Sequence, residues 1–469
     1  MNKVFVSGIK ILVVLTSFYA ETVAQAGASS LGDPLNGLTP AELQAFQRGQ
    51  QTFQEIDSVT GTEPGTNGSG LGPRFNSNSC VSCHASPSAG GSSPAVNPQF
   101  RMANQFGAKN SVPFFISENG PVRAARFKYN ADGTRDGGVH DLYVISGRAD
   151  AGKCNIVQPD FNQANKTNNV IFRIPTPLFG AGLIEQIPDT NILNNKLDNQ
   201  SGKLAMGIAG HENRSGNDGT ITRFGWKAQN KSLTIFAGEA YNVEQGVTNE
   251  LFPTERDETP SCHFNATPED HTNLEVSSML ESISDVTAFG TFMRFLAPPP
   301  SLIPKNIPLQ SRNLASVPES SLPVAVQAGA KNFVTVGCAN CHTPSLMTGD
   351  SSTVALSNVR VDLFSDLLLH HMGPGLADDI IQGASAPDEF RTAPLWGLGQ
   401  RLFFLHDGRT NDLTTAIQAH AGGTKACAVG QATLANGAFC ASEANQVVRN
   451  FNALSNADRK ALLTFLKAL

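Results

Sequence analysis

The chain contains Cys80-Val81-Ser82-Cys83-His84 and, much later, Cys338-Ala339-Asn340-Cys341-His342, two copies of the pattern Cys-x-x-Cys-His. Two thiols at this spacing can bond to the two vinyl groups of one haem, and the histidine that follows then lies beneath the haem iron. The pattern therefore predicts two covalently bound c-type haems. The predicted attachment residues are Cys80, Cys83, Cys338 and Cys341, and the predicted iron ligands are His84 and His342.

Two other uses of these cysteines are less favoured. A zinc site made from both Cys-x-x-Cys pairs would have to join segments that lie far apart in the sequence. A pair of redox-active dithiols would not need histidine at the same position twice.

Composition excludes several classes of protein. The 469 residues carry a formal net charge of -6, with 40% hydrophobic and 16% charged residues. A nucleic-acid binder normally shows a basic field, so this balance argues against nucleic acid as a partner. The hydrophobic content and the low charge density argue against a disordered chain. The length allows two or more domains that each bury a core.

The N-terminus is typical of a secretory signal peptide. Lys3 precedes an apolar stretch over residues 4–20, and Ala24-Gln25-Ala26 offers a cleavage site between small residues. We therefore predict a signal peptide over residues 1–26 and a periplasmic protein. Because no later segment approaches the length of a transmembrane helix, no membrane span is expected after cleavage.

The four remaining cysteines are Cys154, Cys262, Cys427 and Cys440. An even number of cysteines outside the haem patterns of an exported protein predicts disulfides. Three pairings are possible. The simplest joins Cys154 to Cys262 and Cys427 to Cys440, because it keeps each bridge near one haem segment.

Similar segments occur twice in the same order, which indicates an internal duplication. In each half, a Gly-x-x-x-Phe segment precedes the haem pattern, a Phe-Arg segment with Pro-Leu follows it, and an apolar segment in helical register closes the half. The paired segments are residues 49–53 and 329–333, residues 172–182 and 390–399, and residues 285–296 and 458–469.

The duplicated unit is predicted to be helical. Thr39-Pro40-Ala41-Glu42 is a capping box with proline at the first helical position, and Ser455-Asn456-Ala457-Asp458 caps the last helix in the same way. A first helix, a haem pattern and a closing helix form the outline of a c-type cytochrome. We expect a mainly α fold with two cytochrome c-like helical haem domains in tandem.

Domain boundaries follow from the same segments. The N-terminal haem domain is predicted over residues 27–297 and the C-terminal one over residues 324–469, joined by a proline-rich linker at 298–323. The N-terminal domain is the longer because of extra segments at 57–79 and around 188–221. Long loops of this kind either line a pocket or decorate the surface.

Several further segments make the chain resemble one superfamily. They are Phe404-Leu405-His406-Asp407-Gly408-Arg409, residues 224–229, residues 241–249 and residues 372–378. Together with the two haem patterns, they resemble the bacterial di-haem cytochrome c peroxidase and MauG superfamily, and more narrowly its di-haem oxidoreductase branch. The similarity runs from about Leu35 to the C-terminus, which is nearly the whole mature chain.

The resemblance implies a peroxidatic haem in the N-terminal unit and an electron-transfer haem in the C-terminal unit. For the C-terminal iron it puts His420 at the position of the sixth ligand, with Met372 or His371 as the alternatives. For the N-terminal haem it puts Glu244 at the position of the acid–base residue, with Glu185 as the second candidate.

Two more positions follow from the resemblance. Trp226 aligns roughly with a tryptophan that lies between the two haems, so it is a candidate electron relay or, alternatively, a core residue. The displaceable histidine of some relatives has no counterpart near Phe100. Either His140 fills that role or the N-terminal iron has an open sixth site.

The leading functional prediction is a periplasmic di-haem peroxidase. Electrons from a small donor protein, a cytochrome or a cupredoxin, would reduce hydrogen peroxide or another small oxidant. The alternatives are a di-haem electron carrier without turnover and a MauG-like oxidase of a partner protein or thiol. Some relatives hold calcium between their domains, so a calcium ion is a further expectation.

Overall fold

The computed structural model describes residues 30–301 and 324–469, apart from residues 67, 74, 76, 103–106, 108–110, 137–138, 141–145, 257–258, 279–281 and 429–430. The predicted signal peptide, residues 1–26, and most of the predicted linker, residues 298–323, lie outside the described residues. In the part that is described, no helix is long and apolar enough to cross a membrane.

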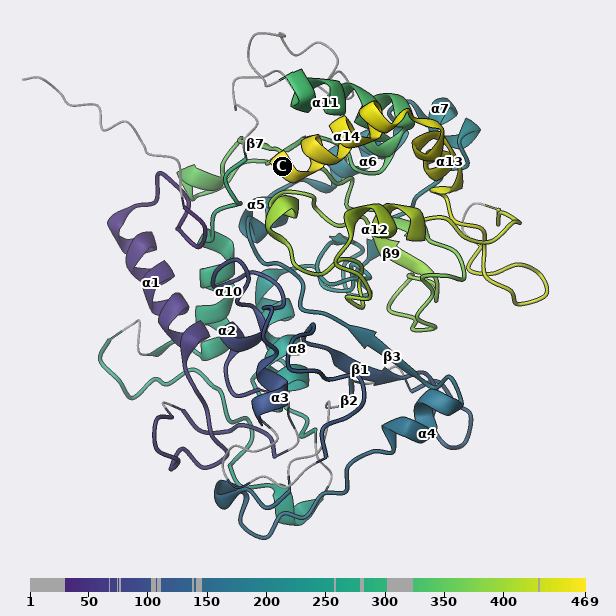
Figure 1. The fold of residues 1–469 in the computed structure, drawn as a ribbon. Helices are drawn as coiled ribbons and strands as arrows, with labels where there is room; N and C mark the ends of the chain where they lie inside the picture. Colours follow the sequence, from purple (N-terminus) through teal and green to yellow (C-terminus); the bar gives the residue numbers. More distant parts are fainter. Residues whose placement is uncertain are drawn as a thin grey trace, which may run out of the picture.

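Helices dominate the described chain (Figure 1). Before the linker they are α1 (Pro40–Gln54), α2 (Cys80–Cys83), α3 (Pro98–Met102), α4 (Phe161–Lys166), α5 (Ala181–Glu185), α6 (Asp189–Leu197), α7 (Gln200–Ala205), α8 (Leu233–Gln245) and α10 (Asp285–Phe295). After it they are α11 (Val324–Val336), α12 (Leu413–Ala419), α13 (Asn445–Ala453) and α14 (Asn456–Ala468). The expected mainly helical character is confirmed.

The strands are short and form small antiparallel sheets that the sequence did not reveal. They are β1 (Ala124–Phe127), β2 (Val139–His140), β3 (Val170–Arg173), β4 (Asn213–Arg214), β5 (Ile221–Thr222), β6 (Leu346–Met347), β7 (Arg360–Val361), β8 (Leu369–His371) and β9 (Glu389–Arg391). β1 lies between β2 and β3, whereas β4 pairs with β5, β6 with β7, and β8 with β9.

The first helix packs against the helix that closes the N-terminal half. Thr39 caps α1 as expected, because its backbone N–H donates to Glu42 Oε2 (2.8 Å) while its hydroxyl accepts from the Glu42 backbone N–H (3.3 Å). Gly49 lies at the crossing with α10, where an added Cβ would stand 2.3 Å from the Ala288 carbonyl oxygen. Only glycine allows the two backbones to approach this closely.

The C-terminal half repeats this crossing with equivalent residues. Gly329 of α11 lies against α14, where an added Cβ would stand 2.1 Å from the Ala461 carbonyl oxygen. Ser455 caps α14 by accepting from the Asp458 backbone N–H. In the duplication alignment Gly329 corresponds to Gly49 and Ala461 to Ala288, so the repeated sequence makes a repeated contact.

The main apolar core crosses the predicted domain boundary. Phe46, Phe53, Phe292 and other side chains of the N-terminal half share one buried cluster with residues from beyond the linker, among them Leu356, Leu363 and Trp396. A second cluster, built around Phe333, Phe451 and Phe465, belongs to α11, α13 and α14. The two halves are therefore joined by side chains as well as by the linker.

Both expected disulfides are present, Cys154–Cys262 and Cys427–Cys440. The extra segment around 188–221, which the sequence suggested was a long loop, contains two helices, α6 and α7. Met206, just after α7, lies against the second haem pattern, where the Asn340 side-chain N–H donates to its sulfur (3.4 Å). This segment therefore covers the C-terminal haem pattern.

Candidate haem sites

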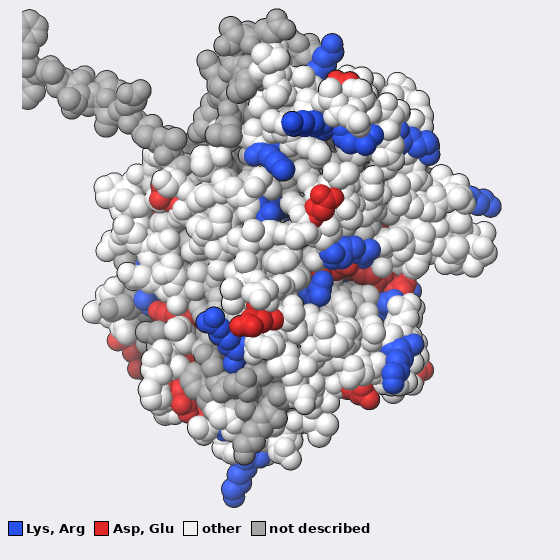
Figure 2. All heavy atoms as spheres, viewed as in Figure 1, with Lys and Arg blue, Asp and Glu red and all other residues white. Residues whose placement is uncertain are grey.

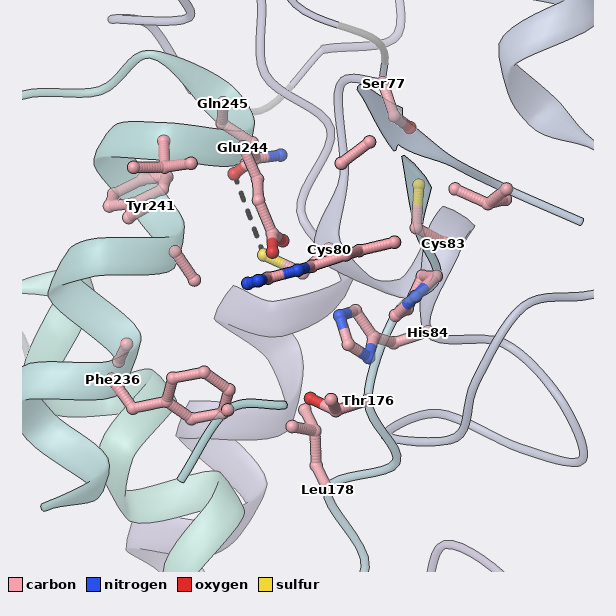
Figure 3. A pocket seen from close by; sticks show the side chains of 18 of the residues that line it. Ser77, Cys80, Cys83, His84, Thr176, Leu178, Phe236, Tyr241, Glu244 and Gln245 are labelled. Carbon is pink, nitrogen blue, oxygen red and sulfur yellow. Dashed lines mark hydrogen bonds between the residues drawn. The ribbon is translucent and has the colours of Figure 1, made fainter. Parts of the chain in front are cut away.

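The first haem pattern opens onto a cavity of about 150 Å³ between α2 and α8 (Figure 3). Cys80 and Cys83 are the first and last residues of α2, and His84 ends that helix. All three line the cavity, together with apolar side chains from α1, α8 and α10. These apolar walls include Phe53, Leu178, Phe236, Tyr241, Phe289 and Met293.

His84 is held with one nitrogen bonded to the backbone. Its Nδ1–H donates to the Gly91 carbonyl oxygen (3.0 Å), and burial lowers the pKa of the imidazole to about 4. The ring is therefore neutral, and Nε2 is the nitrogen left to bind a metal. A backbone hydrogen bond of this kind also fixes the orientation of a ligating histidine.

Glu244 enters the same cavity from α8. Figure 3 shows its carboxyl group and the His84 ring reaching into the cavity from different elements. The Glu244 side chain keeps accessible surface and lines this cavity, while the surrounding protein desolvates its carboxyl group. Burial, with a smaller effect from Glu239, raises the pKa of Glu244 to about 7. A carboxyl with this pKa can both take up and release a proton near neutral pH.

Glu185, the second candidate, has a different environment. Its carboxylate accepts from Arg294 Nε (2.8 Å) and from the Leu233 backbone N–H at the start of α8 (2.8 Å). It is absent from the lining of the cavity. Glu185 therefore joins α5, α8 and α10, and the structure gives it no access to a ligand in the cavity.

The second haem pattern opens onto a cavity of about 220 Å³ in the C-terminal half. Cys338, Cys341 and His342 line it, and apolar side chains of α11, α12, α13 and α14 form most of the remaining wall. The Nδ1–H of His342 donates to the Phe364 carbonyl oxygen (3.0 Å). Burial and the charge of His420 lower the pKa of His342 to about 4, so this imidazole also presents Nε2.

His420 ends α12 and lines the second cavity. Its Nδ1–H donates to the Ala416 carbonyl oxygen (2.7 Å), and burial lowers the pKa of its imidazole. Met372 lines the cavity as well. His371 is absent from the lining of this cavity. Its Nδ1 is hydrogen-bonded to Asp388 (2.9 Å) and its Nε2 to the Gln431 carbonyl oxygen (3.0 Å), so neither nitrogen is available to an iron.

The residues present fit a haem in each cavity. The four cysteines of the two patterns are free thiols, whereas the other four form disulfides. Burial raises the pKa of Cys83 and of Cys338 to about 12, which makes these thiols poor metal ligands or redox nucleophiles by themselves. The two Cys-x-x-Cys pairs line different cavities, so they cannot form one four-cysteine zinc site.

Trp226 lines both cavities. Its indole N–H donates to the Ile174 carbonyl oxygen (2.9 Å), and the Ile174 N–H donates to the His406 carbonyl oxygen (2.7 Å). The Trp226 and His406 rings meet edge to face at 6.4 Å, and His406 stacks on Phe390 at 4.3 Å. Aromatic rings and hydrogen bonds therefore form a continuous path from one cavity to the other.

The sequence interpretation missed one pair of cavity residues. Arg173 lines the first cavity and Arg391 lines the second, each as the arginine of a repeated Phe-Arg segment. Arg173 is paired with Asp378, and burial lowers the pKa of Arg391 to about 10. Buried arginines suit the carboxylates of a haem. The repeat itself was the signal, because the same residue recurs at the same place beside each haem pattern.

Two expectations remain predictions. The backbone of His140 lies in β2 and pairs with Ala125 of β1, and its side chain lies outside the described part of the structure. The close groups of potential metal ligands in the described chain each include cysteine and histidine, which differs from the all-oxygen set that calcium prefers.

A model of the family described as "Di-haem oxidoreductase, putative peroxidase" matches residues 139–469. No curated protein matches the sequence significantly.

Three solved structures are distantly similar to this chain. Hydrazine synthase of Kuenenia stuttgartiensis is 14% identical with a TM-score of 0.37, over 99% of this chain and 100% of that one. A MauG-like protein associated with microbial copper homeostasis is 20% identical with a TM-score of 0.24, over 42% of this chain and 55% of its own. The diheme peroxidase BthA from Burkholderia thailandensis is 17% identical with a TM-score of 0.23, over 41% and 51%. The chain thus spans about half the length of these last two, and TM-scores of this size carry no functional conclusion.

Proposed function

Because this chain belongs to the di-haem oxidoreductase family, we propose that it is a periplasmic peroxidase that reduces hydrogen peroxide with electrons from a small redox protein. The observation that carries the proposal is the pairing of His84 with Glu244 in one apolar cavity, where the pKa of Glu244 is about 7. A metal-binding imidazole and a proton-carrying carboxyl are the two groups that peroxide reduction needs from the protein.

In this proposal each half of the chain is a cytochrome c-like haem unit. Cys80, Cys83 and His84 would hold one haem, and Cys338, Cys341 and His342 would hold the other. The repeated helix crossings at Gly49 and Gly329 support the tandem arrangement. Two disulfides are in keeping with export through a signal peptide.

The N-terminal cavity is assigned the chemistry. A haem supplies an iron site for peroxide and a route for electrons when it is bound. Glu244 would take a proton from one peroxide oxygen and give it to the other, which would leave as water. With two electrons and two further protons from solvent, one peroxide yields two waters. The apolar walls limit the entry of other water to the site.

The C-terminal cavity is assigned electron transfer. His342 and His420 both line it with one nitrogen bonded to a backbone carbonyl, so each presents its second nitrogen to the same space. A haem held by both of these imidazoles would have no free site for peroxide and would pass electrons instead. Trp226, which lines both cavities, is the proposed relay. The donor would be a small cytochrome or cupredoxin.

Steady-state turnover tests this function. The exported holoprotein is mixed with a reduced cytochrome c or a reduced cupredoxin, and oxidation of the donor is followed after hydrogen peroxide is added. We expect multiple turnovers that stop when peroxide is exhausted. Turnover no faster than that of free haem would identify an electron carrier instead. Consumption of peroxide only with a partner protein or thiol as the oxidised substrate would identify an oxidase.

A further inference from the structure

Three side chains outside the haem cavities converge beside the Cys427–Cys440 disulfide. His371 ends β8, Asp388 directly precedes β9, and Cys440 lies in the segment between α12 and α13. One donor atom from each lies within 4.8 Å of the other two. Asp388 and Cys440 are fully buried, and His371 is 8% exposed.

The carboxylate of Asp388 is incompletely satisfied. Its Oδ1 accepts from His371 Nδ1 (2.9 Å), but Oδ2 is buried and has no hydrogen-bond partner in the described structure. A buried charged oxygen without a partner is costly, and in native proteins it commonly marks a missing water or ion. A carboxylate oxygen of Asp388 lies within 4.8 Å of the Cys440 sulfur, so a group bound by this carboxylate would lie close to the disulfide.

Opening the disulfide would supply two further ligands at this point. Reduction by two molecules of a small thiol gives the Cys427 and Cys440 thiols, and the two reductant molecules leave as their own disulfide. Each protein thiol then loses its proton when its sulfur binds a cation. Because the two sulfurs are bonded in the oxidised protein, the Cys427 sulfur starts next to that of Cys440, which already lies in the cluster with Asp388.

We propose that the reduced protein binds one zinc ion through Cys427, Cys440, His371 and Asp388, and that the disulfide keeps this site closed. Two thiolates, an imidazole and a carboxylate form a tetrahedral set that suits zinc. The ion takes the place of the proton between His371 Nδ1 and Asp388. His371 Nε2–H keeps its hydrogen bond to the Gln431 carbonyl oxygen (3.0 Å), which orients the ring as backbone carbonyls commonly do for zinc-bound histidines.

The site adjoins the C-terminal cavity. Glu443 lies three residues after Cys440, lines that cavity, and bonds to His370 Nδ1 (2.7 Å) and to the His371 backbone N–H. A change of ligand at His371 would therefore reach a residue of the cavity wall through one hydrogen bond. This connection makes the site a means by which redox conditions and zinc together act on the electron-transfer half.

Zinc binding by the holoprotein tests the proposal. The protein is treated with a phosphine reductant or left oxidised, dialysed against buffered Zn²⁺, and analysed for zinc by mass spectrometry. We expect about one zinc per reduced chain and far less than one per oxidised chain. Zinc-edge X-ray absorption should then show sulfur at about 2.3 Å from the metal. Equal zinc content in both states, or a spectrum without sulfur, would overturn the proposal.

Variants separate this site from other thiols. Asp388→Asn should weaken zinc binding at least ~10-fold in the reduced protein. Cys427→Ser should allow binding without any reductant, because Cys440 is then free. The matched control removes the other disulfide by Cys154→Ser and Cys262→Ser, and it should keep the reductant-dependent zinc of the wild type. Loss of zinc in this control, or full affinity in Asp388→Asn, would refute the assignment. If Asp388→Asn does not fold, His371→Gln replaces it with the same expected loss.

Discussion

Replacing Glu244 by glutamine tests the proposed proton transfer most directly. Glu244→Gln keeps the size and the hydrogen-bonding shape of the side chain but removes its ability to carry a proton. A general acid–base group contributes ~10²–10⁴-fold to a rate. Peroxide turnover should fall by about that factor, while the mass and the absorbance spectrum show both haems in place.

The raised pKa makes the test sharper. With a pKa of about 7, half of the Glu244 carboxyls are ionised at pH 7, and the ionised fraction falls about tenfold for each lower pH unit. The kcat/KM for peroxide in the wild type should therefore decline with that slope on the acid side. Glu244→Gln should lack this limb, since glutamine does not titrate.

The same pKa has a consequence for stability. The folded-state pKa lies above the ordinary value of 4.5, so the neutral carboxyl is favoured in the folded protein. Its stabilising contribution is full below about pH 4.5 and is lost as the pH rises through about 7. Denaturant titrations of the holoprotein should show the wild type losing more stability than Glu244→Gln between pH 5 and pH 8.

Glu185→Gln is the matched control for this prediction. Glu185 is a second partly buried glutamate near the same helix, but it is paired with Arg294 and is absent from the cavity lining. Its replacement should leave the acid limb of the pH profile in place. The reasoning would be refuted if Glu185→Gln abolished turnover while Glu244→Gln retained both the wild-type rate and the acid limb.

Three further predictions concern the haems. Mass spectrometry of the exported protein should give the mature chain plus two haems, with one lost when Cys338 and Cys341 are both changed to Ala; haem extracted from the wild type by acidic organic solvent would contradict this. His420→Ala should convert one low-spin ferric EPR signal to high spin, whereas Met372→Leu should not; the opposite result would make Met372 the ligand. Trp226→Phe should slow oxidation of the reduced C-terminal haem after peroxide is added in stopped flow, without changing either haem spectrum; an unchanged rate would make Trp226 a core residue.

Short-range chemistry made part of this molecule predictable. The Cys-x-x-Cys-His patterns, the capping box at Thr39 and the closing helix at residues 456–468 each follow from residues a few positions apart. For such features the sequence spacing almost fixes the spatial spacing. The duplication made features far apart in the sequence predictable as well, because a weak pattern is more convincing when it recurs in the same order in both halves.

Other features depend on contacts that no local pattern encodes. The choice between Glu244 and Glu185 required knowing that Arg294 lies beside the latter. The small sheets escaped prediction because strands of two to four residues carry too little alternation to be recognised. His371 was an alternative iron ligand in the sequence interpretation, and only its bonds to Asp388 and Gln431 show that both of its nitrogens are engaged elsewhere.

The core that joins the two halves limits how this protein can be divided. Leu356, Leu363 and Trp396 pack in the same cluster as Phe46 and Phe292, so a cut in the linker would leave apolar surface on both fragments. Neither fragment should be soluble alone, whereas co-expressed fragments should reassemble by complementation. For the same reason we expect loss of structure in one half to destabilise the other half in denaturant. The shared interior should therefore make the two similar halves depend on each other for their stability.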